Sequence, residues 1–476
     1  MSKMVLPNVM HTGRSGMTAA KAAISTAGHN IANANTEGYS RQRVQQASEA
    51  PYGAAGSKTL IGHGARIARV ERLNDQYIEK QIRNNGRDLA NNEEKDIVLK
   101  QAEDVFNEMG GEGLNRVMSR FFNEFRKLAN EPENEGVRQA VRESSQSLVN
   151  DFRRLRSGIE DITRHADARI ESHVGEMNAI AEEIKDLNVR IKAMELGGAS
   201  ANDLGDKRDL LLKKLSTYAD LSMHQDSGGG YIIDVKGVGP LVVGGQTEKF
   251  SVQRSPANDE GKPEGGFDII SSSNVRGNVT HQLKSGKLGA LVEARDQVLG
   301  TMLSRLDELA FQVSQSVNEI HRSGFTRTGF QGVDYFKPLQ QKQGAAEFFD
   351  LSDAVQASAN NIAAAATPDS PGDNRVAIAI SGIQNHQLMN DGQTSVDDFY
   401  NSIVSEVGVA AAKNRSSLVQ HKDIMNQLGK MREQISGVSI DEETTNLMQY
   451  QHAFDASAKV IQIADELMKT VLSLRG

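Results

Sequence analysis

The C-terminal stretch 440–474 carries apolar side chains in three columns, each repeating at a strict seven-residue step. On an α-helix these columns merge into one stripe, and a sustained repeat of seven is typical of a coiled-coil seam. Asp441, Glu442 and Glu443 place negative charge at the positive end of the helix dipole. The columns consist of Leu447, Phe454, Ile461 and Met468; of Ala453, Val460, Leu467 and Leu474; and of Tyr450, Ser457, Ala464 and Val471.

A lone helix with this stripe would be only marginally stable in water. Burying one large apolar side chain contributes about 1.5–3 kcal/mol. Ordering each residue costs about 1–2 kcal/mol of backbone entropy. The stripe therefore predicts a second surface that covers it.

The nearest partner for the stripe is a thinner heptad repeat in the alanine-rich stretch Arg14 to Ala34. Small residues on that predicted helix allow another helix to approach closely. Asn and Gly residues that tolerate left-handed backbone then stop the helix, after which Tyr39 to Gln45 are expected to run extended. The repeat consists of Met17, Ile24 and Ile31 with Ala20, Ala27 and Ala34, and the stop contains Asn30, Asn33, Asn35, Thr36, Gly38 and Tyr39.

Composition limits the class of protein. The chain has 476 residues, a net charge of −8 and no cysteine, so disulfides and thiolate metal sites are excluded and nothing global favours nucleic acid. No run of about 18 apolar residues is present, and the N-terminus lacks the apolar core of a cleavable signal peptide. On composition alone we would expect a cytoplasmic protein without membrane insertion.

Helical periodicity fills most of the interior, so the chain is predicted to be mainly α. The longest periodic segment, 137–194, is typical of a coiled-coil-like rod and not of a globular helix. Residues 46–64 are expected to form a loop. The other predicted helices cover 73–109, 114–130, 204–218, 288–321, 375–385 and 395–435.

Residues 219–283 change character, with Gly-punctuated apolar runs that predict a small inserted β domain. The irregular region 324–375 is expected to be anchored to the rod by Phe330, Tyr335, Phe336, Phe348 and Phe349. The predicted strands cover 231–235, 241–243, 249–253 and 267–270. The predicted domains are 1–45 with 437–476 (inner), 46–218 with 284–436 (helical rod) and 219–283 (outer).

The run Asn30-Ile31-Ala32-Asn33, followed by Thr36, Gly38 and Tyr39, resembles the signature of the flagellar rod, hook and hook-associated axial proteins. Other runs are similar to one branch of that family, the hook-associated protein 1 family, over nearly the whole chain. These runs include Glu442–Glu443, Leu447, Tyr450-Gln451 and Ala453-Phe454, with Asn202-Asp203-Leu204, Ser285-Gly286-Lys287-Leu288-Gly289 and Val317-Asn318-Glu319-Ile320-His321 in the interior.

The resemblance implies an elongated axial protein with paired terminal coiled-coil helices, a long-helix rod and the small β insert. Its implied role is structural, at the junction between hook and filament. The implied partners are further copies in a ring or helical homo-oligomer, the flagellar hook protein and hook-associated protein 3. An export chaperone and the type III export apparatus are implied too, which would place the chain in the flagellum outside the cell without a cleaved signal peptide.

Sequence signals for catalysis, a cofactor or a metal are weak, and none is predicted. His165 and His173 stand eight residues apart without a third ligand, and Gly237-Val238-Gly239 precedes Pro240 and favours a β-turn over a dinucleotide loop. An enzyme carried on the tube would need paired carboxylates or a metal cluster in 219–283. That segment has only scattered acidic residues, namely Asp234, Asp259, Glu260, Glu264 and Asp268.

Two readings of the terminal stripes remain open. They could form core within one subunit or pack against neighbouring subunits, and three columns allow both. Another axial component, such as a hook or distal-rod protein, is expected to lack the long 137–194 helix. The ends are predicted to be largely disordered in the free chain and helical in the tube. The residues predicted to pack subunits are Met17, Ile24, Ile31, Leu447, Tyr450, Phe454, Val460, Ile461, Leu467, Met468, Val471 and Leu474.

Overall fold

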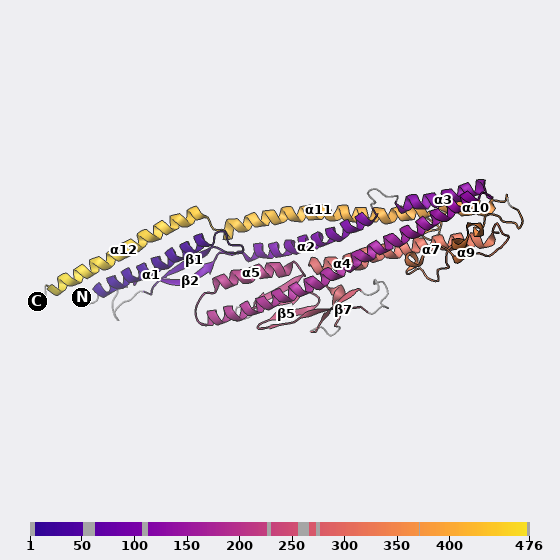
Figure 1. Cartoon of the computed structure of the whole chain (residues 1–476). Helices are drawn as coiled ribbons and strands as arrows, with labels where there is room; N and C mark the ends of the chain where they lie inside the picture. The colour runs from indigo at the N-terminus through magenta and orange to yellow at the C-terminus, as the bar shows by residue number, and fades with distance from the viewer. Residues whose placement is uncertain are drawn as a thin grey trace. The chain divides into compact units, whose positions relative to one another are not determined.

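A computed structural model describes residues 5–50, 62–106, 113–225, 230–255, 266–272, 277–370 and 372–473 (Figure 1). By contact density the chain forms two compact units. The first contains Met1–Asp88, Glu176–Lys249 and His421–Gly476, and the second contains Leu89–Gly175 and Phe250–Gln420. This division is coarser than the three predicted domains, whose boundaries stay a prediction.

Helices dominate the described residues, which confirms the mainly α class. Three long helices contribute residues to both units: α2 (Gln76–Phe106), α4 (Glu135–Leu196) and α11 (Val396–Ser436). The prediction of a helix over 137–194 is confirmed, because α4 extends it by only two residues at each end. No helix among the described residues has the length and apolar content needed to cross a membrane.

The first unit contains the two terminal helices, α1 (Val5–Ala32) and α12 (Ile440–Ser473). Helix α1 begins at Val5, well before the predicted Arg14. Pro7 is tolerated there because the N–H groups of a first helical turn have no partner within the helix. A hairpin of β1 (Gln42–Ser48) and β2 (Ala65–Arg72) lies against α1 in Figure 1.

The hairpin corrects the predicted loop over 46–64. Strand β1 continues through Ser48, and β2 pairs with it antiparallel from Gln42 opposite Arg72 to Ser48 opposite Ala65. The charged residues of β2 obscured its pattern, since only one face of an edge hairpin needs apolar side chains. The rest of this unit includes α5 (Asn202–Ser216) and a sheet of β3 (Leu221–Gln225), β4 (Tyr231–Val235), β5 (Gly239–Val243) and β6 (Gln246–Thr247).

The second unit has a helical core. Its main helices are α3 (Leu114–Asn130), α6 (Gly286–Glu293), the π-helical segment η2 (Ala294–Leu299) and α7 (Gly300–Ser323), and its sheet pairs β7 (Phe250–Arg254) with β8 (Phe267–Ser271). The strands of the 219–283 insert therefore form two sheets, one in each unit. Short elements complete it: α8 (Ala345–Phe348), α9 (Asp353–Ala357), α10 (Arg375–Gly382), η1 (Thr280–Gln282), η3 (Ala359–Asn361) and η4 (Ile383–Asn385).

Three of the five predicted aromatic anchors are buried. The Phe349 ring packs 5.0 Å from Phe152, and Asn318 Oδ1 accepts the backbone N–H groups of Tyr335 and Phe336, which sets both rings in the core. The anchoring prediction was wrong for Phe330 and Phe348, which are 67% and 62% exposed. Phe348 is the last residue of the short helix α8, and Phe349 follows it with extended backbone.

Candidate functional site

The terminal helices α1 and α12 form an antiparallel pair (Figure 1). Gly13 lies opposite Ile461 near one end, and Asn30 lies opposite Glu443 near the other. The pairing expected between the two sequence stripes is therefore present within one chain.

Glycines let the two helices approach closely. A Cβ atom on Gly13 would lie 2.7 Å from Ile461 Cγ1, and one on Gly16 would lie 2.7 Å from Ser457 Oγ. Ala20, Ala23 and Ala27 are also buried on α1. The alanine-rich composition of this helix therefore reflects close backbone packing.

The three predicted columns of α12 differ in burial. The column of Leu447, Phe454, Ile461 and Met468 is partly buried throughout, which places it on the α1 side with Ile461. In the next column Tyr450 is partly buried and Ala464 fully buried, but Val471 is 43% exposed. On α1, the predicted residues Met17, Ile24 and Ile31 are all partly buried.

The remaining column of α12 faces solvent. Val460 is 37% exposed and Leu467 is 52% exposed, and Leu474 lies outside the described residues. Ile463, which the sequence analysis did not select, is 50% exposed on the same side. We call Val460, Ile463, Leu467 and Val471 the outer stripe, because their spacing of three and four places them on one helix face.

A polar junction closes the other end of the pair. Asn30 is 1% exposed, and its Nδ2 donates to Gln42 O at 2.9 Å and to Glu443 Oε2 at 3.0 Å. Its Oδ1 accepts from Tyr39 OH at 2.7 Å and from Gln42 N at 2.9 Å. The predicted motif residues Asn30 and Tyr39 therefore meet in one network that includes the start of α12.

Arg41 supplies the charge that balances Glu443. Its guanidinium contacts Glu443 Oε1 and Glu442 Oε2, both at 2.7 Å, and its backbone N–H donates to Ser436 O at 2.9 Å. Glu443 is only 3% exposed, so this ion pair is largely withdrawn from water. The Glu443 charge at the helix start could be predicted from the sequence, but its partner Arg41 could not, because 402 residues separate the two.

Helix α5 supplies further carboxylates to the junction. Asp206 Oδ2 accepts from Ser40 N at 3.1 Å, and Asp206 Oδ1 lies 3.0 Å from Arg72 NH1. Burial raises the pKa of the Asp206 carboxyl, opposed by the Ser40 N–H and Arg72. Burial, with the nearby Asp203 carboxylate next in size, also raises the pKa of the Tyr39 hydroxyl, which keeps it a neutral donor.

The remaining motif residues shape the turn that leads into the junction. Asn33 Nδ2 donates to His29 O at 3.0 Å, and Thr36 N donates to Asn33 O at 2.9 Å, so both end α1. Gly38 has a φ of +83°, and a Cβ there would lie 3.2 Å from Leu210 Cβ. The motif therefore acts inside the subunit as a helix stop and a link to α5.

The weak sequence signals for a metal site and for a dinucleotide loop both belong to ordinary structural features. His173 Nε2 lies 3.1 Å from the buried Glu94 carboxylate, and Gly237–Gly239 form a turn with positive φ between β4 and β5. Among the described residues, no group of three or more His, Asp and Glu side chains could hold a metal.

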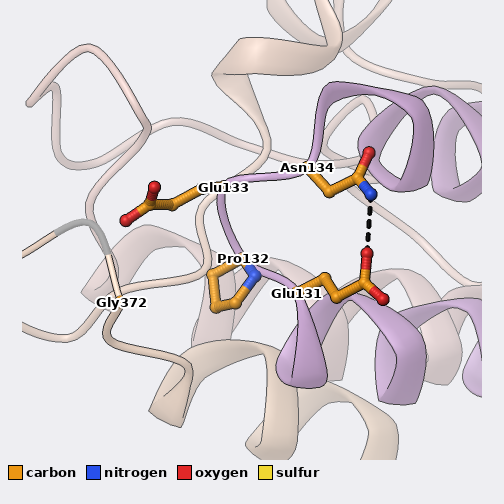
Figure 2. A pocket seen from close by; sticks show the side chains of 5 residues that line it. All are labelled: Glu131, Pro132, Glu133, Asn134 and Gly372. Carbon is orange, nitrogen blue, oxygen red and sulfur yellow. Dashed lines mark hydrogen bonds between the residues drawn. The ribbon is translucent and has the colours of Figure 1, made fainter.

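One surface hollow is lined by Glu131, Pro132, Glu133, Asn134 and Gly372 (Figure 2). Asn134 Nδ2 donates to Glu131 Oε2 at 2.6 Å, and Asn134 Oδ1 accepts from Gly136 N at 2.9 Å. The bond from Gly136 N caps the start of α4, while Glu133 points away from Glu131 and Asn134 in Figure 2. The hollow is therefore explained by the α3–α4 turn.

Comparison with protein families gives three matches along the chain. The model described as flagellar hook-associated protein FlgK helical domain matches residues 99–336, which is half of the chain. A flagella basal body rod protein model matches 10–39, and the flagellar basal body rod FlgEFG protein C-terminal model matches 433–474. The last two matches coincide with α1 and its turn, and with α12.

Full-length relatives agree with these matches. Flagellar hook-associated protein 1 of Bacillus subtilis (strain 168) is 29% identical over 506 residues, covering 98% of each chain. The protein of the same name from Escherichia coli (strain K12) is 25% identical over 560 residues, covering 99% of this chain and 100% of the relative. The solved flagellar hook junction protein FlgK from Burkholderia pseudomallei shares the fold, with a TM-score of 0.66 and 15% identity over 75% of this chain and 100% of that one.

Proposed function

The chain belongs to the flagellar hook-associated protein FlgK family and is a structural protein of the flagellum at the hook–filament junction, and we propose that it assembles there through its terminal helix pair. In this proposal α1 and α12 of many copies form the inner part of a tube or ring. The flagellar hook protein and hook-associated protein 3 would adjoin it on either side. Assembly is templated, because each added copy offers the next one the same surface.

The outer stripe is the observation that carries this proposal. Helix α12 already packs against α1, yet Val460, Ile463, Leu467 and Val471 still present an apolar face to solvent. Continuous exposed apolar surface marks an interaction site more often than scattered single residues do. A neighbouring subunit that covers the face would remove it from water and favour the assembled state.

The same exposure supports the proposed route out of the cell. Until assembly covers the outer stripe, a chaperone that masks it would prevent aggregation. We therefore propose that an export chaperone binds the C-terminal helix and that the type III export apparatus passes the chain to the flagellum. The acidic net charge of −8 favours protein partners over nucleic acid.

Replacing Leu467 with Glu tests the role of the outer stripe. The charge would be buried in the assembled tube but exposed in the free chain, so we expect at least about tenfold less incorporation into flagella. Cells that lack their own copy would express either variant, and incorporation would be measured by immunoblot of purified flagella. Gln462→Glu is the matched control, since it adds the same charge to the same helix at another exposed position.

Normal incorporation of Leu467→Glu would contradict assembly through this face. Deleting 440–476 should abolish assembly while the second unit stays folded. We also expect the ends to be largely disordered in the free chain and helical in the tube. Circular dichroism and limited proteolysis of the free chain measure this, and protected helical ends before assembly would contradict the expectation.

Two other functions are less well supported. A hook or distal-rod protein would explain the rod-type matches at 10–39 and 433–474, but not the match of 99–336 to the FlgK helical domain or the long helix α4. An enzymatic insert would need converging carboxylates. Asp234 and Asp268 lie in different sheets, whereas Asp259, Glu260 and Glu264 fall outside the described residues.

A further inference from the structure

We propose that Asn30, Arg41 and Glu443 fix the register in which α1 pairs with α12. Every subunit then presents the outer stripe at the same position along the axis of the assembled tube. This inference deepens the proposed assembly role and rests on it. It assigns a positioning function to a buried polar network, whereas the outer stripe makes the contact itself.

Apolar packing alone does not choose a single register. Both helices repeat their apolar columns every seven residues, so a slip of seven brings similar side chains opposite one another again. Such a slip moves one helix by about 10.5 Å along its axis. The observed register places Gly16 opposite Ser457.

Steric clashes exclude one of the two registers that differ from the observed register by seven residues. A slip in one direction would bring Tyr450 opposite Gly16, where a large ring would force the closely packed helices apart. A slip in the other direction would bring Ala464 opposite Gly16, and its small side chain fits the space that Ser457 occupies now. This second register is the competitor that the chain must exclude.

The polar junction excludes the competitor electrostatically. Glu443 is 3% exposed and is held by Asn30 Nδ2 at 3.0 Å and by the Arg41 guanidinium at 2.7 Å. A seven-residue slip separates Glu443 from Asn30, and Arg41 stays tied to Ser436 O through its backbone N–H. Breaking a buried ion pair while one charge stays buried is strongly unfavourable, and single buried polar residues are known to specify register in coiled coils.

A uniform register matters because the outer stripe is also periodic. A subunit slipped by seven residues would offer Val460 where its neighbours offer Leu467. Its apolar face could still bind a neighbouring subunit, but the rest of the subunit would be displaced from its correct position by about two helical turns. The junction therefore protects assembly from misaligned copies.

Engineered disulfides can read the register directly, since the chain contains no cysteine. A Cβ on Gly16 would lie 3.5 Å from Ser457 Cβ, within the range that a disulfide accepts, so G16C with S457C reports the observed register. G16C with A464C reports the slipped one. Each pair is placed in the full-length chain, oxidised free and in purified flagella, and scored by peptide mass spectrometry.

With the junction intact, we expect the 16–457 link to dominate in purified flagella, and in the free chain among the copies whose ends have paired as helices. Glu443→Ala should raise the ratio of 16–464 to 16–457 links by at least about tenfold. Asn30→Ala should raise it less, because Arg41 still balances Glu443. Glu466→Ala is the matched control on the exposed face of the same helix and should leave the ratio unchanged.

Three results would overturn the proposal. An undiminished 16–457 link in Glu443→Ala would show that apolar packing sets the register. Loss of both links in Glu443→Ala, but not in Glu466→Ala, would show that the junction holds the helices together without choosing their register. Equal yields of the 16–457 and 16–464 links in the chain with an intact junction would show that no register is fixed. The links form within one chain, so a failure to localise to flagella would reject the proposed function separately.

Discussion

Helices α3 and α12 differ in how much of their surface the chain itself covers. Both carry a clear amphipathic pattern, yet α3 buries eight of its 17 residues, whereas α12 buries only Glu443 and Ala464 among 34. Phe121 of α3 packs against Phe122 and Phe125 at centroid distances of 5.0 and 5.1 Å, and it is 0% exposed. An amphipathic sequence pattern can thus lead either to a core buried within one chain or to an apolar surface that only another copy would cover.

Phe121→Ala should have the largest effect on stability. Removing a fully buried ring leaves a cavity that costs about 3–5 kcal/mol. Urea unfolding of the full chain, followed by hydrogen exchange of peptides from 114–130, measures the loss in the second unit. An effect below about 1 kcal/mol would mean that α3 is no better packed than α12 and would remove the contrast between them.

Acid should weaken the second unit through His321. Its Nδ1 donates to Val333 O at 2.7 Å and its Nε2 accepts from Ala363 N at 2.8 Å, so the folded ring is neutral. Burial lowers the pKa of His321 from 6.5 to about 4, helped by Arg138 and opposed by Asp334. The unfolded chain therefore takes up a proton first as the pH falls.

This depressed pKa gives the sign of the pH dependence. The contribution of His321 is fully present above pH 6.5 and is lost as the pH falls from there toward about 4, amounting to about 3 kcal/mol. Urea midpoints at several pH values in that window measure it. His321→Gln should flatten the dependence, and an equally steep curve for that variant would assign the effect to other groups.

Gly13→Val should act on the terminal pair and spare the second unit. The new side chain would clash with Ile461 Cγ1, and overpacking of this kind costs about 1–3 kcal/mol. Yield of the 16–457 disulfide measures the helix separation, and urea unfolding of the second unit serves as the internal control. An unchanged yield would indicate that the helices are not in close contact at Gly13.

Leu467→Ala should have the smallest effect on the stability of the free chain, within about 0.5 kcal/mol, because the side chain is already half exposed. Its effect should appear only on assembly, as weaker incorporation into flagella. A large loss of stability in the free chain would place Leu467 in a core and make α12 resemble α3.

The helices could be predicted well because their apolar period is strong. Helix α3 matches its predicted range of 114–130, and α4 differs little from its own. The π-helical segment η2 was hidden inside the predicted helix over 288–321, since one wider turn barely disturbs the apolar pattern. Strand β2 was missed because its partner strand is distant and most of its side chains are polar.

The candidate site was only partly predictable. Heptad columns identified the two helices and their pairing, but they could not say which column faces α1. That choice depends on Gly13 and Gly16, whose lack of a side chain draws Ile461 and Ser457 inward. The Asn30–Arg41–Glu443 network depends on contacts between residues far apart in the sequence, and a local pattern carries no signal for such contacts.

The N-terminal and C-terminal segments of the chain have complementary surfaces. Asn30 and Arg41 from the first end bind Glu443 from the last, and the glycines of one helix accommodate the side chains of the other. An axial protein whose N-terminal segment is exchanged for that of a relative would therefore need the matching C-terminal segment in the same transfer. Over generations, a change at one end of such a chain invites a compensating change at the other.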